Sequence, residues 1–282
     1  MERIRSTAVF AACSLLVMSA SAAALRRERR LATRPTSLTI NMSTDGADAT
    51  PGDGKCDIDP ITPYNQCTLR AAIMEADFWG PGLSINLRID PGTYSLSIPP
   101  SGTDDASTGD LDVTTDVTFN GPDGDPTGVI TADPGFGDRL IDIPAGVAPH
   151  IVMFGLTLQN GSAPGGGSGG AIRSLGTGTL TISNTVFTND TATGSGGGMY
   201  VKGGTLSMPS RVTFLNDNAD GNGGGLDVEG ATAATYVSGT VQGNSAGGKG
   251  GGLALFTETG GIGSFSVDTS TFADNSATGS GG

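Results

Sequence analysis

The sequence predicts an all-β protein: a right-handed parallel β-helix preceded by a disulfide-containing cap with one short helix. Three observations indicate this fold: a glycine-rich composition, a repeat in the second half, and alternating apolar residues within each repeat. Glycine supplies 47 of 282 residues, whereas 15% are charged and 5% aromatic. A helical bundle or coiled coil needs more Leu, Glu and Lys, and the glycines lack the three-residue period of collagen.

Two series of residues recur with one period of 27 residues, except that the last member of the second series follows after 31. The first series comprises the apolar residues that follow glycine corners: Ile172, Met199, Leu226 and Leu253. The second series opens a repeated phrase rich in Asn and Asp: Phe187, Phe214, Val241 and Phe272. The alternative for this region is a disordered glycine-rich linker. Such a linker would not keep two separate series of apolar residues at the same spacing.

Each repeat carries three short alternating stretches, as in residues 199–201, 205–208 and 212–214. Alternation turns one face of each strand inward, and one repeat cannot bury that face without stacked neighbours. We therefore predict coils of about 27 residues with three strands each. Both series should form buried inward stacks, with equivalent side chains about 4.8 Å apart. The longer last interval predicts an outward loop within residues 257–263.

The glycine corners and the Asn/Asp phrases fit the turns of such a coil. A glycine suits a bend where a side chain would clash with backbone. Asn and Asp tolerate a left-handed backbone, and they can stack from coil to coil in hydrogen-bonded ladders.

The N-terminus predicts export. Residues 1–24 combine a short basic start, an apolar run over residues 7–18 and the small-residue pattern Ala20-Ser21-Ala22, which is typical of a cleaved signal peptide. The apolar run is shorter than the roughly 20 residues needed to span a bilayer. Residues 25–36 are basic, and we interpret them as a flexible segment. The expected location is secreted or at the cell surface, without a transmembrane span.

The charge of the chain argues against binding to nucleic acid or anionic membranes, and its cysteine content argues against a zinc site. Residues 35–282 carry 8 basic and 26 acidic side chains, a balance that repels nucleic acid and anionic membranes. Removal of the signal leaves Cys56 and Cys67, which in an oxidising compartment are expected to form one disulfide. Two cysteines and the single His150 do not make a zinc site.

Residues 37–110 are expected to form an N-terminal capping region, and residues 111–282 the β-helix. Apolar residues at helical spacing predict a helix over residues 68–77, with Thr68 as N-cap. Because a terminal coil has no stacking partner, we expect Leu69 and Ile73 on this helix to cover the end of the β-helix.

The capping region resembles a known domain. Cys56 and the run Cys67-Thr-Leu-Arg-Ala-Ala-Ile-Met-Glu-Ala-Asp77 are similar to the CSLREA domain of bacterial surface proteins, with Ala71 in place of the usual Glu. Gly-Gly-Ala-Ile at residues 169–172 and Phe-x-x-Asn at residues 272–275 resemble the repeats of chlamydial polymorphic outer-membrane proteins. These resemblances imply a β-helix exposed on or secreted from a Gram-negative-type cell. They imply little about chemistry, because the fold serves adhesins, lyases and hydrolases alike.

Two classes of function remain open. The favoured class is a non-catalytic surface or secreted protein, acting in adhesion or as a structural element, whose partner is an extracellular polysaccharide or a neighbouring cell surface. The alternative is a polysaccharide lyase or glycoside hydrolase similar to pectate lyases, which needs clustered carboxylates and a base. The repeats offer charged candidates for that chemistry: Asp190, Asp217, Asp220, Asp227, Glu229, Arg173, Lys202 and Arg211. Asp190 and Asp217 fall in the repeated turn phrase and are interpreted as turn formers, so no catalytic residue is assigned.

An acidic loop before the disulfide is the one candidate for a cofactor. Asp45, Asp48 and Asp53, followed by Asp57 and Asp59, offer the oxygen ligands that Ca²⁺ prefers. Their spacing does not match the EF-hand, and a solvated acidic turn is the alternative. No other cofactor is predicted.

The chain stops at Gly281-Gly282, inside the next glycine corner. An open coil would expose an unpaired strand edge, so the sequence is expected to be a fragment whose anchoring device lies beyond residue 282.

Overall fold

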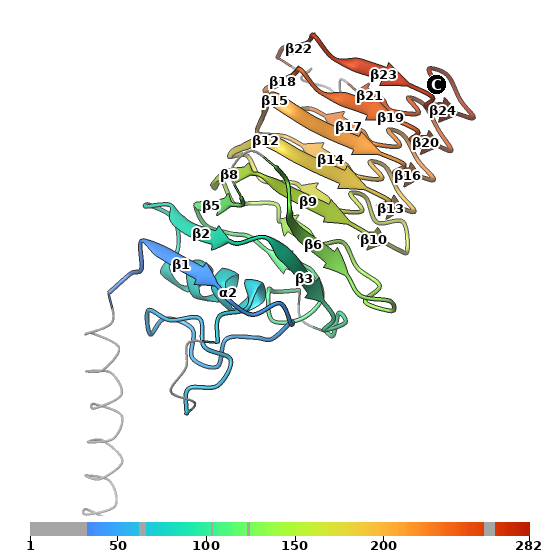
Figure 1. Cartoon of the computed structure of the whole chain (residues 1–282). Helices are drawn as coiled ribbons and strands as arrows, with labels where there is room; N and C mark the ends of the chain where they lie inside the picture. Colours follow the sequence, from blue (N-terminus) through green and yellow to red (C-terminus); the bar gives the residue numbers. More distant parts are fainter. Residues whose placement is uncertain (1–32, 62–65, 103, 123–124, 257–262) are drawn as a thin grey trace, which may run out of the picture.

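The computed structural model describes residues 33–61, 66–102, 104–122, 125–256 and 263–282, and it is a parallel β-solenoid of about six coils (Figure 1). The predicted β-helix is therefore confirmed. The predicted signal peptide and most of the basic segment lie outside the described residues, as do residues 257–262 of the expected outward loop. Among the residues described, no helix has both the length and the apolar character that crossing a membrane requires.

Three parallel sheets form the walls of the solenoid. The largest has 13 strands: β1 (Ser37–Ile40), β2 (Ile85–Ile89), β3 (Gly92–Leu96), β5 (Val117–Asn120), β6 (Gly128–Ala132), β8 (His150–Phe154), β9 (Leu156–Gln159), β12 (Thr179–Thr188), β15 (Thr205–Leu215), β18 (Ala233–Val237), β19 (Thr240–Gln242), β22 (Phe265–Asp268) and β23 (Thr271–Ala273). The second has six: β4 (Leu111–Asp112), β7 (Ile141–Ile143), β11 (Ile172–Ser174), β14 (Met199–Lys202), β17 (Leu226–Glu229) and β21 (Leu253–Phe256). The third has five: β10 (Ser162–Ala163), β13 (Thr191–Ala192), β16 (Asn218–Ala219), β20 (Ser245–Ala246) and β24 (Ser276–Ala277).

Both predicted series pair in the expected register. Ile172, Met199, Leu226 and Leu253 are successive partners in the second sheet. Phe187, Phe214, Val241 and Phe272 are successive partners in the largest sheet, and the first two rings stack with centroids 4.7 Å apart. Six of the eight are buried, but Leu253 is only partly buried and Phe272 is 45% exposed. The prediction that all are buried is wrong for Phe272, because it lies on the last described coil and has a stacking partner on one side only.

The coil itself differs from the prediction in three details. The expected strands 205–208 and 212–214 are one continuous strand, β15, which bends near Arg211, a residue with φ of 48°. The third wall is made instead by the short strand β16, which forms the end of the phrase that begins at Phe214. Coils before β11 are also longer than 27 residues, since Val117 pairs with Ile151, 34 residues on.

The predicted polar ladder runs inside the solenoid. Side-chain oxygens of Asp190, Asp217, Asn244 and Asn275 each accept a hydrogen bond from the backbone N–H one coil earlier, at 2.8–3.0 Å. The residue before each ladder member turns the chain with positive φ, as at Asn189 and Asn216. Buried Asp and Asn therefore satisfy backbone groups that the bend takes out of the sheets.

The glycine corners are close approaches of backbone to backbone. A Cβ on Gly197 would lie 2.2 Å from the carbonyl oxygen of Gly224, and one on Gly224 would lie 2.2 Å from that of Gly251. Since neighbouring strands are about 4.8 Å apart, a side chain at these positions would force the coils apart.

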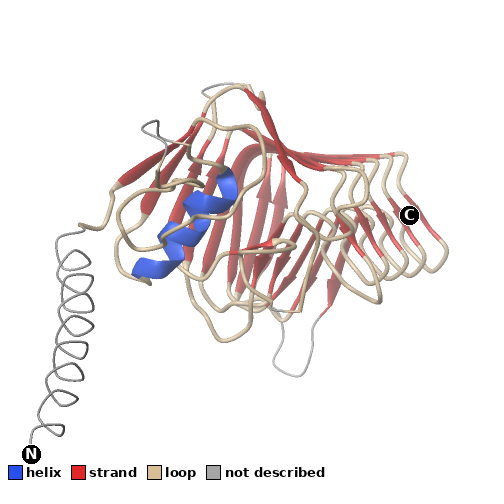
Figure 2. Cartoon of the chain, turned by 90° about the horizontal axis from the view of Figure 1, so that it is seen from below, coloured by secondary structure: helices blue, strands red, loops and turns tan. Residues whose placement is uncertain are grey.

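The cap closes the N-terminal end. Cys56 and Cys67 form the predicted disulfide, and helix α2 (Leu69–Trp79) begins after the N-cap Thr68. The helix extends two residues beyond the prediction and ends before Gly80, whose φ is 67°. Figure 2 shows α2 at the end of the solenoid, where Leu69 and Ile73 join the hydrophobic core.

Candidate functional site

A pocket of about 340 Å³ lies where α2 meets the first coil. Three segments supply most of its polar and aromatic lining: Asp77 and Phe78 from α2, Asp105 and Ser107 from the loop before β4, and Asp112 and Thr114 from β4 and the residues after it. A volume of this size falls within the range of about 300–1,000 Å³ that is common for small-molecule sites.

The loop that forms one wall of the pocket is held by a buried arginine. Arg70 on α2 is 0% exposed and forms a two-pronged ion pair with Asp45, at 2.7 and 2.9 Å. The same guanidinium donates to the carbonyls of Ala106 and Gly109 at 2.9 and 2.8 Å. Asp45 also accepts from the backbone N–H groups of residues 97 and 98. Both ends of the loop are therefore tied to one ion pair, which preorganises this wall.

A second buried side chain, that of Glu75, holds the segment against which Phe78, the aromatic wall of the pocket, packs. Glu75 accepts hydrogen bonds from the backbone N–H of Gly54 at 2.8 Å and from Trp79 Nε1 at 2.6 Å, and it also binds the N–H of Gly52. The Phe78 ring packs against Gly52, where a Cβ would fall 2.1 Å from the ring. Phe78 remains 47% exposed, so it presents apolar surface to the pocket.

The carboxyl groups of the pocket differ in protonation. Burial raises the pKa of Asp77 to about 6, although Asp77 Oδ1 accepts from the Thr114 N–H at 2.9 Å. Burial, and then the charges of neighbouring carboxylates, raises the pKa of Asp112 to about 8. Hydrogen bonds from Ser107 lower the pKa of Asp105. Near pH 7 Asp112 is therefore mostly a hydrogen-bond donor, whereas Asp77 and Asp105 are mostly acceptors.

The charged residues that the sequence offered for catalysis are largely paired or buried. Asp190 and Asp217 lie in the internal ladder, and burial raises the pKa of both well above the usual range. Arg173 forms a two-pronged pair with Asp142, with both distances 2.7 Å. Glu229 accepts from the Tyr200 hydroxyl at 2.7 Å.

The remaining candidates are divided among different surroundings. Lys202 lies 3.7 Å from Glu229 as an ion pair, and burial followed by the charge of Glu229 raises the pKa of Asp227 to about 7. Asp220 and Arg211 are exposed. None of these residues lines the pocket beside α2.

The aspartates of the loop predicted to bind calcium make other interactions in the structure or are buried. Asp45 is paired with Arg70, and both side chains are 0% exposed. Asp48 is buried, and Asp53 accepts from the N–H of Lys55. Across the described residues, the carboxylates close enough to share an ion are a different group: Asp104, Asp110 and Asp112. Calcium at the sequence-predicted loop stays a prediction.

Sequence reasoning missed the pocket. Asp77 is the last residue of the predicted helix and Phe78 follows it directly, and the run Asp104-Asp105 with Asp110 and Asp112 was an unused signal of an acidic wall. Comparisons with protein-family models, with curated proteins and with solved structures returned no match. The resemblances to CSLREA domains and to chlamydial outer-membrane repeats therefore stay predictions.

Proposed function

We propose that this chain is an exported β-helix protein that binds an extracellular carbohydrate in the pocket beside α2 without cleaving it. The observation that carries the proposal is the combination of the Phe78 ring with the carboxyl groups of Asp77, Asp105 and Asp112 in one pocket. A sugar ring has an apolar face and a rim of hydroxyl groups, and a site with one aromatic wall and several hydrogen-bonding groups matches both.

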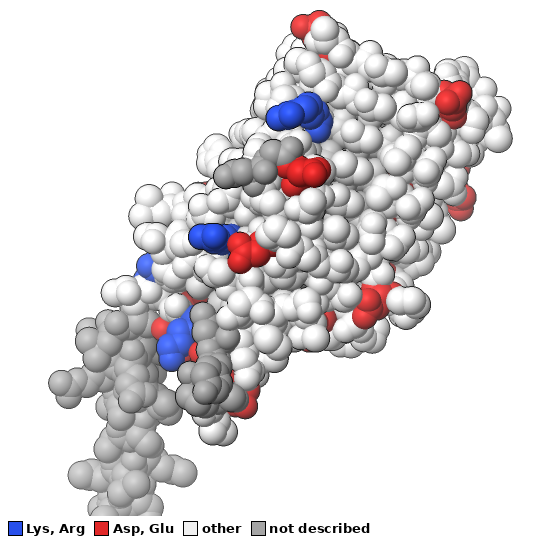
Figure 3. Space-filling model, in the orientation of Figure 1, with Lys and Arg blue, Asp and Glu red and all other residues white. Residues whose placement is uncertain are grey.

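The charge of the pocket favours neutral or amino sugars over uronates. Asp77 and Asp105 are mostly ionised near pH 7, and residues 35–282 carry 26 acidic against 8 basic side chains. A uronate would meet like charge, which opposes binding. Charged side chains are few and scattered on the face of the molecule that Figure 3 draws.

Export is supported by the chemistry of the cap. The Cys56–Cys67 disulfide suits an oxidising compartment outside the cytosol. The disulfide agrees with the signal-peptide pattern of residues 1–24, which indicates a secreted or cell-surface location.

Titration calorimetry of the signal-cleaved protein tests the binding role. Chito-oligosaccharides and cello-oligosaccharides should bind, and oligogalacturonates should bind more weakly or not at all. Phe78→Ala should lower the affinity about tenfold, because loss of an aromatic contact removes roughly 1–1.5 kcal/mol. Phe272→Ala is the matched control, since Phe272 is similarly exposed, at 45%, on the last described coil. Absence of binding to all three ligands, or equal affinity of Phe78→Ala and wild type, would overturn the proposal.

One observation favours the alternative of a polysaccharide-cleaving enzyme. Asp112 and Asp77 line one pocket with pKa values of about 8 and about 6, a separation that can supply a general acid and a general base. Reducing ends or unsaturated products released from chitosan, cellulose or pectin by wild type, but not by Asp112→Asn, would favour that function over binding alone.

A further inference from the structure

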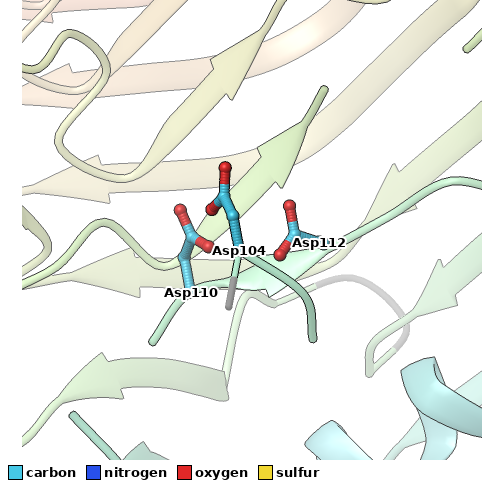
Figure 4. A group of neighbouring side chains, drawn as sticks. All are labelled: Asp104, Asp110 and Asp112. Carbon is cyan, nitrogen blue, oxygen red and sulfur yellow. The ribbon is translucent and has the colours of Figure 1, made fainter. Parts of the chain in front are cut away.

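The group formed by Asp104, Asp110 and Asp112 lies beside the pocket and has a geometry suited to a cation. One oxygen of each carboxylate lies within 4.8 Å of the others. In Figure 4 the three side chains face a common space, with Asp112 on β4 and Asp110 and Asp104 on the chain just before it. Two oxygens bound to one Ca²⁺ can be about 5 Å apart, twice the usual Ca–O distance of 2.3–2.6 Å, so this spacing needs little adjustment.

A buried oxygen without a partner points into the same group. Asp112 is 6% exposed, and its Oδ2 makes no hydrogen bond in the structure. A buried carboxylate oxygen without a donor is costly, and native structures usually satisfy such groups with protein, water or an ion. A bound cation would supply the missing interaction.

Among the described residues, the negative charges of Asp104 and Asp112 are not balanced by an ion pair with a positively charged side chain, so a divalent cation could neutralise them. Arg139 pairs with Asp110 at 2.6 Å, and Arg173 pairs with Asp142. Of the ion pairs between described residues, none involves Asp104 or Asp112. The charges of Asp110, Asp142 and Asp104 all raise the pKa of Asp112, after burial as the largest cause. A divalent cation would remove this repulsion.

The donor set favours calcium over magnesium and over transition metals. All three ligands are carboxylates, and no cysteine or histidine belongs to the group. Mg²⁺ requires a nearly ideal octahedron at about 2.0–2.1 Å, whereas Ca²⁺ accepts six to eight oxygens in flexible geometry.

We propose that Asp104, Asp110 and Asp112 bind one Ca²⁺, which fastens the loop before β4 to the first strand of the second sheet. Arg70 holds this loop from the side of the cap, and the ion holds it from the side of the solenoid. The site would stabilise the junction between cap and coils. The Ca²⁺ site is tested without any sugar, so its failure can be distinguished from failure of the carbohydrate proposal, but the two sites share Asp112, which bound Ca²⁺ would keep ionised.

The test uses signal-cleaved protein freed of metal with a chelator. Calorimetry with CaCl₂ should show one bound ion, and the melting temperature should rise by roughly 3–5 °C for each tenfold increase of free Ca²⁺ above the Kd. MgCl₂ at the same concentrations should shift melting less.

Asp104→Asn is the decisive variant, because Asp104 is exposed and its replacement should leave the fold intact. It should weaken Ca²⁺ binding at least tenfold, and Asp112→Asn should abolish it. Asp53→Asn, in the acidic loop before the disulfide, is the control and should bind like wild type. No heat and no melting shift with millimolar CaCl₂ would overturn the proposal, and so would wild-type affinity in Asp104→Asn. Loss of binding in Asp53→Asn alone would place the ion in the acidic loop instead.

Discussion

Replacing Asp217 with Asn should make the protein more stable at neutral pH. Asp217 is 1% exposed, its Oδ1 accepts from the Asp190 N–H at 3.0 Å, and its Oδ2 has no hydrogen bond. One coil further on, Asn244 fills the equivalent position and uses its amide to donate to the Phe214 carbonyl at 3.0 Å. An Asn at position 217 would keep the accepting oxygen and present an amide in place of the unpartnered oxygen.

The size of the effect follows from hydrogen bonding. Removal of a buried unsatisfied oxygen is worth about 1–3 kcal/mol, and each new hydrogen bond adds about 0.5–1.5 kcal/mol. We expect Asp217→Asn to raise the free energy of unfolding by about 1–3 kcal/mol at pH 7, allowing for imperfect geometry of the new amide.

The pH dependence has a definite sign. Burial raises the pKa of Asp217 in the folded protein, so the folded state holds a proton that the unfolded chain releases above its pKa of about 3.9. The stability from this proton is fully present below that value and is lost as pH rises toward the folded pKa, by about 1.4 kcal/mol per pH unit. The advantage of Asp217→Asn should therefore be small at pH 4 and grow as pH increases.

Urea denaturation at pH 4, 5, 6 and 7 measures this difference. Asp220→Asn is the matched control, because Asp220 is an exposed residue of the same coil and should change stability by less than about 0.5 kcal/mol. If Asp217→Asn unfolds at the same or a lower urea concentration than wild type at pH 7, or if its advantage does not grow with pH, the proposed burial of a protonated Asp is wrong.

Three further changes test the cap and the coils. Reduction of the Cys56–Cys67 disulfide, or its replacement by serines, should cost roughly 2–3 kcal/mol by loop-closure entropy, measured by urea denaturation; an unchanged midpoint would contradict this. Ile73→Asp should cost several kcal/mol and cause aggregation, because it buries a charge at a side chain that is 0% exposed; wild-type yield and melting would refute the capping role. Gly224→Ala should destabilise by about 2 kcal/mol or more, because its Cβ would meet the next coil at 2.2 Å. Gly230→Ala, whose Cβ meets nothing within 4 Å, carries only the backbone strain of an alanine at φ of 59° and should lose less in the same melting assay.

The repeat made most of the solenoid predictable. In a parallel coil, residues one period apart become strand partners, so the spacing of Met199 and Leu226 predicted their pairing directly. The same argument failed at Phe272, because burial depends on a neighbouring coil and not on phase alone. It also misplaced the third strand, since a single left-handed residue such as Arg211 bends a strand without ending its pairing.

The pocket was less predictable because its residues obey no period. Asp77, Asp105 and Asp112 come together only through the fold of the cap onto the first coil, and Arg70 positions the loop between them from 36 and 39 residues away. A sequence reveals that Arg70 lies on a helix, but it does not reveal which carbonyls that side chain will meet.

This contrast suggests where function lies in the molecule. In the regular coils several charged side chains pair with a residue of a neighbouring coil, as Arg173 does with Asp142 and Lys202 with Glu229. Segments that depart from the period have no equivalent neighbour above or below, and their side chains are available to line concave surfaces. The loop with Asp104 and Asp105 is such a segment, and it borders both the pocket and the proposed Ca²⁺ site. The proposed function therefore assigns recognition to the junction where the repeat begins, with the regular coils as its scaffold.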